Sequence, residues 1–102
     1  MHSFRLAPRA EADLDGIADC CVREYGDRQC TLYLGELELR FARLREVLML
    51  ERPCERIRPG LKNQKQGHHV VLYFHESEGV LIVRVLRERM VHDEHDLTNA
   101  DP

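Results

Sequence analysis

Two stretches of helical periodicity fill the first half of the chain. Between residues 9 and 26, apolar side chains recur at intervals of three and one residues, as one stripe of an amphipathic helix does. This first stripe comprises Leu14, Ile17, Ala18, Cys21, Val22 and Tyr25. A second stripe follows and comprises Cys30, Tyr33, Leu34, Leu37, Phe41, Leu44 and Leu48. The pattern predicts two consecutive amphipathic helices.

The residues between and around these stripes predict where the helices begin and end. Pro8 suits a helix start, and Gly26 suits a left-handed cap at the end of the first helix. Asp27 can cap the second helix, which we expect to run about twenty residues until Pro53 stops it. So short a connection predicts an antiparallel two-helix hairpin. Both stripes then need one shared apolar surface, which a sheet supplies.

Apolar strands predict that sheet. Phe4 and Leu6 alternate within residues 3–7, and two nearly continuous apolar runs, at 68–75 and 80–88, flank the turn "ESEG". Runs that are apolar on both faces indicate central strands. A further strand is expected around Glu55–Arg58, before the Pro59-Gly60 turn, and a loosely patterned strand or a loop after it. The predicted fold class is α+β: an N-terminal strand and a two-helix hairpin packed on a three- to four-stranded antiparallel sheet.

Composition and charge narrow the class of protein. The chain has 102 residues, 43% of them hydrophobic and 32% charged, which predicts a single domain over residues 1–102 with a frayed tail at 97–102. No apolar run is long enough to cross a membrane and no signal peptide is evident, so we expect a cytoplasmic protein. The net charge is −3, and residues 52–67 form a local basic patch, with five bases and one acid. This balance argues against nucleic acid as the main partner.

Four cysteines are present, and none of them forms a C-x-x-C pair. The neighbours Cys20 and Cys21 suit neither zinc nor an easy disulfide. We therefore expect all four cysteines to be free thiols in a reducing compartment.

Two stretches resemble a known family. The opening "RLAPRAEADLDGIADCCVREYGDRQCTLYLGEL" resembles the RelE/ParE superfamily of bacterial toxins, and "IRPGLKNQKQGHHVVLYFHESEGVLIVRVLRERM" resembles its ParE branch. The positions that match the ParE pattern are Gly67, His69, Tyr73, Arg84, Val85, Leu86 and Met90. The resemblance covers about residues 3 to 97. No single motif is strong alone, and their order along the chain makes the match specific.

The resemblance implies the toxin of a type II toxin–antitoxin system. Such a toxin binds DNA gyrase, traps it on cleaved DNA and is neutralised by a cognate ParD-like antitoxin. The implied assembly is a hetero-oligomer with the antitoxin, and a homodimer is the alternative for the chain alone. No cofactor, membrane or direct nucleic-acid partner is implied. Two alternatives stay open: a ribosome-dependent mRNA interferase of the RelE branch, and an antitoxin-binding module that has lost its toxicity.

The nuclease alternative needs a general base, a general acid and cations around a phosphate. Resemblance to the RelE branch places His69 and Glu88 at two positions that are usually basic there, and no tyrosine follows Tyr73. The remaining candidates are His92 and His95 as acid–base groups, with Lys62, Lys65, Arg84 and Arg87 as cations. We expect no catalytic residues and a protein that acts by binding.

The histidines raise two further hypotheses. His68 and His69 alternate across a strand, so they cannot readily act on one substrate. We expect His69 to be structural, hydrogen-bonded to a neighbouring strand or to the C-terminal segment. The stretch "HDEH" at 92–95 has a spacing that can bind a divalent ion, but a solvated acidic tail is favoured, and no metal site is predicted.

Three sets of residues complete the predicted sites. Arg84 sits in an apolar strand, and we favour an ion pair with a carboxylate of a helix or the tail over snorkelling or contact with a partner. Two helices cannot cover both faces of a sheet, so an exposed apolar face is expected to bind the antitoxin. The residues predicted for that face are Val71, Tyr73, Leu81 and Val83. Those predicted to contact gyrase are Arg87, Arg89, Met90 and His92.

Overall fold

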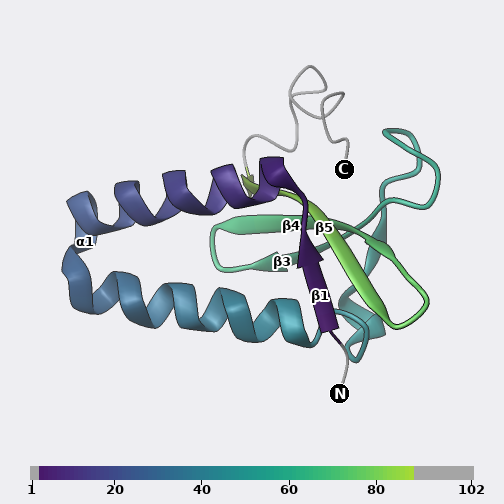
Figure 1. Ribbon diagram of the computed structural model, residues 1–102, viewed down its shortest axis with the longest axis horizontal. Helices are drawn as coiled ribbons and strands as arrows, with labels where there is room; N and C mark the ends of the chain where they lie inside the picture. The colour runs from purple at the N-terminus through teal and green to yellow at the C-terminus, as the bar shows by residue number, and fades with distance from the viewer. Residues whose placement is uncertain (1–2, 89–102) are drawn as a thin grey trace.

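One kinked helix and one five-stranded sheet make up residues 3–88, the part of the protein that the computed structural model describes (Figure 1). The α+β class predicted from the sequence is confirmed. The elements in chain order are β1 (Ser3–Leu6), α1 (Pro8–Ala42), a 3-10 turn η1 (Leu48–Leu50), β2 (Arg52–Pro53), β3 (Lys62–Gln66), β4 (His69–His75) and β5 (Gly79–Arg87).

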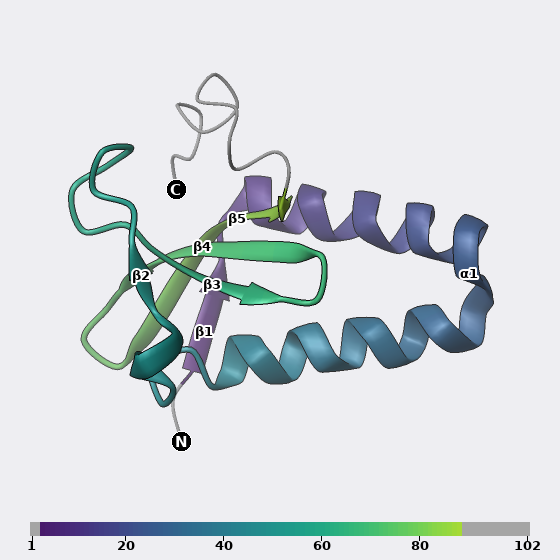
Figure 2. The same cartoon turned by 180° about the vertical axis from the view of Figure 1, so that it is seen from behind.

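Helix α1 is a single element of 35 residues that bends sharply at Gly26. The prediction of two separate helices is therefore wrong. Gly26 has φ 82° and ψ 167°, a conformation that only glycine adopts readily because it has no Cβ. The bend divides α1 into a first arm, residues 8–25, and a second arm, residues 27–42, which extend from it side by side towards the sheet (Figures 1 and 2).

The second arm ends at Ala42, well before Pro53, where the sequence predicted its end. The chain turns here because Leu44 enters the core, where its exposed fraction is 0%. The buried side chain of Gln64 from β3 donates through Nε2 to the Leu44 carbonyl at 2.9 Å. This contact gives the Leu44 carbonyl a hydrogen-bond partner other than the amide of a further helical turn. The helix therefore does not continue, and Leu48 belongs to η1 and is exposed.

The sheet has the strand order β1-β5-β4-β3-β2, and β1 runs parallel to β5 while the other pairs are antiparallel. The prediction of three to four antiparallel strands is wrong. Strand β3 reads KNQKQ and lacks apolar alternation, and β2 has two residues, so neither gives a strand signal in the sequence. The expected strand around Glu55–Arg58 is a turn, in which the amides of Ile57 and Arg58 both donate to the Cys54 carbonyl.

Strands β4 and β5 are central, as predicted, and their side chains fill two clusters on opposite faces. The cluster under α1 contains Leu37, Phe41, Leu44, Val71, Tyr73, Val80, Ile82 and Val85. The other cluster contains Leu61, Val70, Leu72, Val83 and Leu86. The register shifts between Leu72 and Tyr73, because Leu72 pairs with Arg84 while Tyr73 pairs with Ile82. This bulge interrupts strict alternation in β5.

The second face of the sheet is covered, contrary to the exposed apolar face that the sequence predicted. Leu61 belongs to the cluster on this face, and Cys54 and Ile57, from the same loop, pack against it. Val83 and Leu72 have an exposed fraction of 0%. The loop between β2 and β3 therefore supplies apolar cover that its polar composition concealed.

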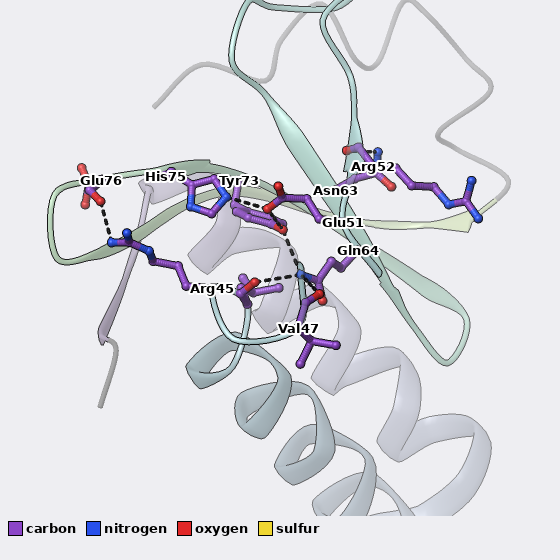
Figure 3. A network of polar contacts seen from close by, with 10 residues as sticks. Arg45, Val47, Glu51, Arg52, Asn63, Gln64, Tyr73, His75 and Glu76 are labelled. Carbon is purple, nitrogen blue, oxygen red and sulfur yellow. Dashed lines mark hydrogen bonds and ion pairs between the residues drawn. The ribbon is translucent and has the colours of Figure 1, made fainter. Parts of the chain in front are cut away.

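A polar network fixes the segment that leads from α1 into β2 (Figure 3). The Tyr73 hydroxyl donates to Glu51 Oε1 at 2.7 Å and accepts from Gln64 Nε2 at 2.9 Å. His75 Nε2 lies 2.5 Å from the same carboxylate oxygen of Glu51. Burial, and then the hydrogen bond to Glu51, raises the pKa of Tyr73, so its hydroxyl stays protonated and can donate. The network ties η1 to β3 and β4.

The first arm of α1 is attached to β5 by a half-buried ion pair. Asp13 accepts from Arg84 Nε at 2.8 Å and Nη2 at 3.1 Å, and also from the Val85 amide at 2.9 Å. The two side chains have exposed fractions of 15% and 16%. A charge removed from water to this extent is costly unless an opposite charge lies beside it, so removing either side chain leaves the other destabilised.

Replacing Gly26 with alanine tests the conformational constraint at the bend. A Cβ there would meet no atom within 4 Å, so any cost arises from the backbone alone. We expect Gly26→Ala to lower the free energy of unfolding by about 1–3 kcal/mol, measured by urea denaturation. Gly35 is the matched control: it lies within the second arm and a Cβ there would also meet nothing. Gly35→Ala should stabilise by about 0.5–1 kcal/mol, and an equal effect at both positions would contradict the constraint.

Replacing Arg84 with alanine tests the ion pair to Asp13. We expect a loss of about 3 kcal/mol or more in the free energy of unfolding, because the Asp13 carboxylate keeps its desolvated position without its countercharge. Arg5 provides the control, since it makes the same two-nitrogen contact with Glu76 while its side chain is 67% exposed. Arg5→Ala should leave the denaturation midpoint nearly unchanged. Equal denaturation midpoints for the two variants would show that burial of the Asp13–Arg84 pair adds nothing to the free energy of unfolding.

Candidate functional site

A groove of about 820 Å³ opens between the two arms of α1 and the adjacent ends of the sheet strands. Its apolar lining includes Ile17, Tyr25, Tyr33, Val85 and Leu86, and its charged groups are Asp13, Glu24, Arg87 and Glu88. The groove exists because the bend at Gly26 sends both arms back to the same region of the sheet (Figures 1 and 2). A mainly apolar concave surface with a few polar groups is typical of a binding site.

The first arm forms one wall, and contacts to β5 position it. The ion pair of Asp13 with Arg84 holds the arm one to two turns before the groove residues Ile17 and Cys20. Further along, Arg87 Nη2 lies 3.0 Å from Cys20 Sγ. The arm is therefore attached to β5 at two points along its length.

The second arm forms the opposite wall, and Tyr33 attaches it to the turn between β3 and β4. The Tyr33 hydroxyl contacts His69 Nδ1 and donates to the Gln66 carbonyl at 3.2 Å. Gly67 has φ 59°, and a Cβ there would lie 2.8 Å from Tyr33 Cε1, so glycine allows this close approach. Arg40 Nε adds a hydrogen bond of 3.0 Å to Gln66 Oε1.

His69 is buried behind the groove, with an exposed fraction of 8%. Burial, followed by the nearby charge of Arg87 and by His68, lowers the pKa of His69, so its imidazole is neutral at physiological pH. Its partner is Tyr33 of the helix, where the sequence suggested a strand or the C-terminal segment. His68 is exposed and lines the groove. Both histidines therefore line the groove, but His69 is buried and bonded to Tyr33 whereas His68 is exposed.

Arg84 takes the first of the three roles considered from sequence, an ion pair with a helix carboxylate. Its partner Asp13 is 71 residues away along the chain. Two of the other three cations considered for a nuclease are also engaged: Lys65 pairs with Glu88 at 2.9 Å, and Arg87 contacts Cys20.

Of the four residues predicted to contact gyrase, Arg87 lies at the end of β5 and lines the groove. Arg89, Met90 and His92 lie outside the described residues, as do the stretch "HDEH" at 92–95 and the predicted tail at 97–102. Within residues 3–88, no group of three or more His, Cys, Asp or Glu side chains is placed to hold a metal ion.

The four residues predicted to bind the antitoxin do not share an exposed face. Val71 and Tyr73 are buried under α1, whereas Val83 is buried in the opposite cluster and Leu81 packs against it half-buried. The expectation of one exposed face is wrong, because α1 covers one side and the loop between β2 and β3 covers the other. Their role in antitoxin binding stays a prediction.

The residues that line the groove were missed because their helical stripe was interpreted as core. Tyr25 belongs to that stripe and lines the groove, yet its exposed fraction is 63%. Tyr25 immediately precedes Gly26, where α1 bends. The two helical stripes are longer than a short sheet can cover, and this length could have predicted that part of each stripe is exposed.

A search for a membrane-spanning helix among the described residues finds none with enough length and apolar character.

Comparison with known proteins identifies the family. The family model described as the ParE toxin of the type II toxin–antitoxin system parDE matches residues 4–92. Toxin ParE1 of Mycobacterium tuberculosis is 36% identical over 88 residues, which are 85% of this chain and 90% of that protein. Toxin ParE1 of Caulobacter vibrioides is 34% identical, with 88% and 93% covered. Toxin ParE of Escherichia coli is also 34% identical, with 88% of each chain covered.

Two solved structures share the fold. A chain of the chromosomal ParDE toxin–antitoxin system from P. aeruginosa superimposes with a TM-score of 0.69 at 23% identity, covering 85% of this chain and 96% of its own length. A chain of the toxin–antitoxin complex RelBE2 from Mycobacterium tuberculosis gives 0.56 at 22% identity, covering 85% and 98%. The family match and the sequence identities show that this chain belongs to the ParE toxin family of type II toxin–antitoxin systems.

Proposed function

We propose that this toxin binds DNA gyrase in the cytoplasm, traps its cleaved complex with DNA, and is neutralised by a cognate ParD-like antitoxin that occupies the groove. Membership of the ParE family supports the toxin–antitoxin setting. The name of the P. aeruginosa structure describes a ParDE system, which supports a ParD-like partner.

The groove is the observation that carries the antitoxin part of the proposal. Its volume of about 820 Å³ suits an inserted row of side chains from a peptide segment, because ligand clefts span roughly 300–1,000 Å³. An amphipathic helix that enters the groove places its apolar side against Ile17 and Tyr25 and its polar side towards Glu24 and Arg87. Binding there would bridge the two arms of α1.

We propose that the toxin acts by binding rather than by catalysis. The cations that a ribonuclease would need around a phosphate are spread over separate contacts: Arg84 lies on Asp13, and Lys65 lies on Glu88. The buried, neutral His69 contacts Tyr33 rather than an open surface. These contacts favour a structural role for the groups that resemble catalytic ones.

Purified toxin added to gyrase, ATP and supercoiled plasmid tests the proposal. We expect linear, cleaved plasmid to accumulate after the protein is denatured and digested. Arg87→Ala should need about tenfold more protein for the same cleavage, because it removes a cation predicted to contact the enzyme. Arg5→Ala is the control, because the Arg5 side chain is 67% exposed and Arg5 lies on β1 opposite Leu81, at the other end of β5 from Arg87. This variant should cleave the plasmid at the same protein concentration as the parent.

Unchanged plasmid with all three proteins would contradict gyrase as the target. If the same preparation then cut mRNA in a translating extract, the interferase alternative would replace the proposal. If expression without antitoxin also caused no growth defect, the alternative of a module without toxicity would replace it.

A further inference from the structure

Two cysteines face each other across the bend of α1. Cys21 lies five residues before Gly26 and Cys30 lies four residues after it, so the fold places them at nearly matching heights on the two arms. Cys30 is buried, with an exposed fraction of 3%, whereas Cys21 is half-buried and lines the groove. This arrangement cannot be read from cysteine spacing, because it depends on the reversal at Gly26.

The contacts of Cys30 show that the arms approach closely here. Its Sγ lies 3.7 Å from the carbonyl oxygen of Ala18, which belongs to the first arm. Ala18 precedes Cys21 by three residues and therefore lies on the same side of that arm. The Cys30 thiol is also among the groups that raise the pKa of Cys21, which agrees with two thiols that lie near each other.

We propose that Cys21 and Cys30 form a reversible disulfide that closes the bend of α1 when the protein meets a peroxide. The deprotonated thiol of Cys21 attacks one oxygen of hydrogen peroxide, the O–O bond breaks, and Cys21 becomes a sulfenic acid while hydroxide leaves and takes up a proton as water. The Cys30 thiol then attacks the Cys21 sulfur, the S–O bond breaks, and a second water leaves. Two thiols lose two electrons in total, and one peroxide gains them.

Access sets the order of these steps. Cys21 is reachable from the groove, whereas Cys30 is shielded and can react only with a neighbour. Cys20 is a poorer partner for Cys21, because adjacent residues of a helix cannot meet disulfide geometry without distorting the backbone. Burial, followed by the neighbouring Cys30 thiol, raises the pKa of Cys21, so the reaction with peroxide is slow at neutral pH and suits a response to sustained oxidation.

The bond would link the two walls of the groove. In the reduced protein the arms are joined by the Gly26 backbone and by noncovalent contacts such as that of Cys30 with Ala18. The disulfide closes a short loop around the bend, which restricts the unfolded chain and fixes the separation of the arms.

Oxidation of the purified full-length chain with hydrogen peroxide at mildly alkaline pH tests the proposal. We expect the intact mass to fall by two hydrogen atoms, and peptide mapping to join the peptides of Cys21 and Cys30. The melting temperature should rise by on the order of 10 °C and return to its starting value with dithiothreitol. Cys20→Ser and Cys54→Ser should behave as the parent does.

Cys21→Ala separates the disulfide from other effects of oxidation. It should melt close to the reduced parent, because Cys21 is half-buried, yet show no rise in melting temperature with peroxide. Cys30→Ser should accumulate the Cys21 sulfenic acid, which a dimedone probe captures; if that variant does not fold, Cys21→Ala alone carries the comparison. Three results of peptide mapping would each overturn the proposal: a bond between Cys20 and Cys21, bonds only between two chains, or no disulfide at all.

Discussion

The backbone at Gly26 is the constraint on which the rest of the molecule depends. Its φ of 82° turns one long helix back on itself, so two amphipathic arms reach one small sheet instead of extending past it. The reversal places Asp13 of the first arm beside β5 and Tyr33 of the second arm beside the β3–β4 turn. It also leaves space between the arms, which becomes the groove. A residue with a Cβ would strain this conformation, so one glycine determines where both walls lie.

Polar contacts then fix walls that apolar packing alone would leave loosely placed. Hydrophobic burial is nondirectional, whereas the contacts of Asp13 with Arg84 and of Tyr33 with His69 each allow one geometry. Both lie where an arm meets the end of a central strand. The molecule thus combines an apolar core, which supplies stability, with a few partly buried polar contacts that shape the groove. This division explains why groups that resemble catalytic residues in the sequence serve as supports in the structure.

Elements with a regular pattern of apolar residues could be predicted from the sequence. Features that depend on contacts between residues far apart in the chain could not. Strand β1 and the helical arms of α1 were evident because their apolar positions repeat at 2.0 or 3.6 residues. Strands β4 and β5 were evident because they are nearly continuous apolar runs. Strand β3 could be predicted only as a strand or a loop, because Gln64 is buried by hydrogen bonds rather than by hydrophobicity. The early end of the helix depends on that same side chain. The partner of Arg84 could be predicted only as a carboxylate, since Asp13 is 71 residues distant. The groove was missed because Ile17 and Tyr25 have the same spacing as core residues.

The central claim is that the antitoxin binds between the arms of α1, and Gly16 offers the most direct measurement. Gly16 lines the groove, and a Cβ there would meet no atom within 4 Å, so a larger side chain projects into open space without disturbing the fold. Gly35 has the same freedom but does not line the groove. The affinity of each leucine variant for a cognate ParD-like antitoxin can be measured by calorimetry. We predict that Gly16→Leu weakens binding at least tenfold, about 1.4 kcal/mol, while Gly35→Leu matches the parent. Equal affinities for the two variants would contradict the claim.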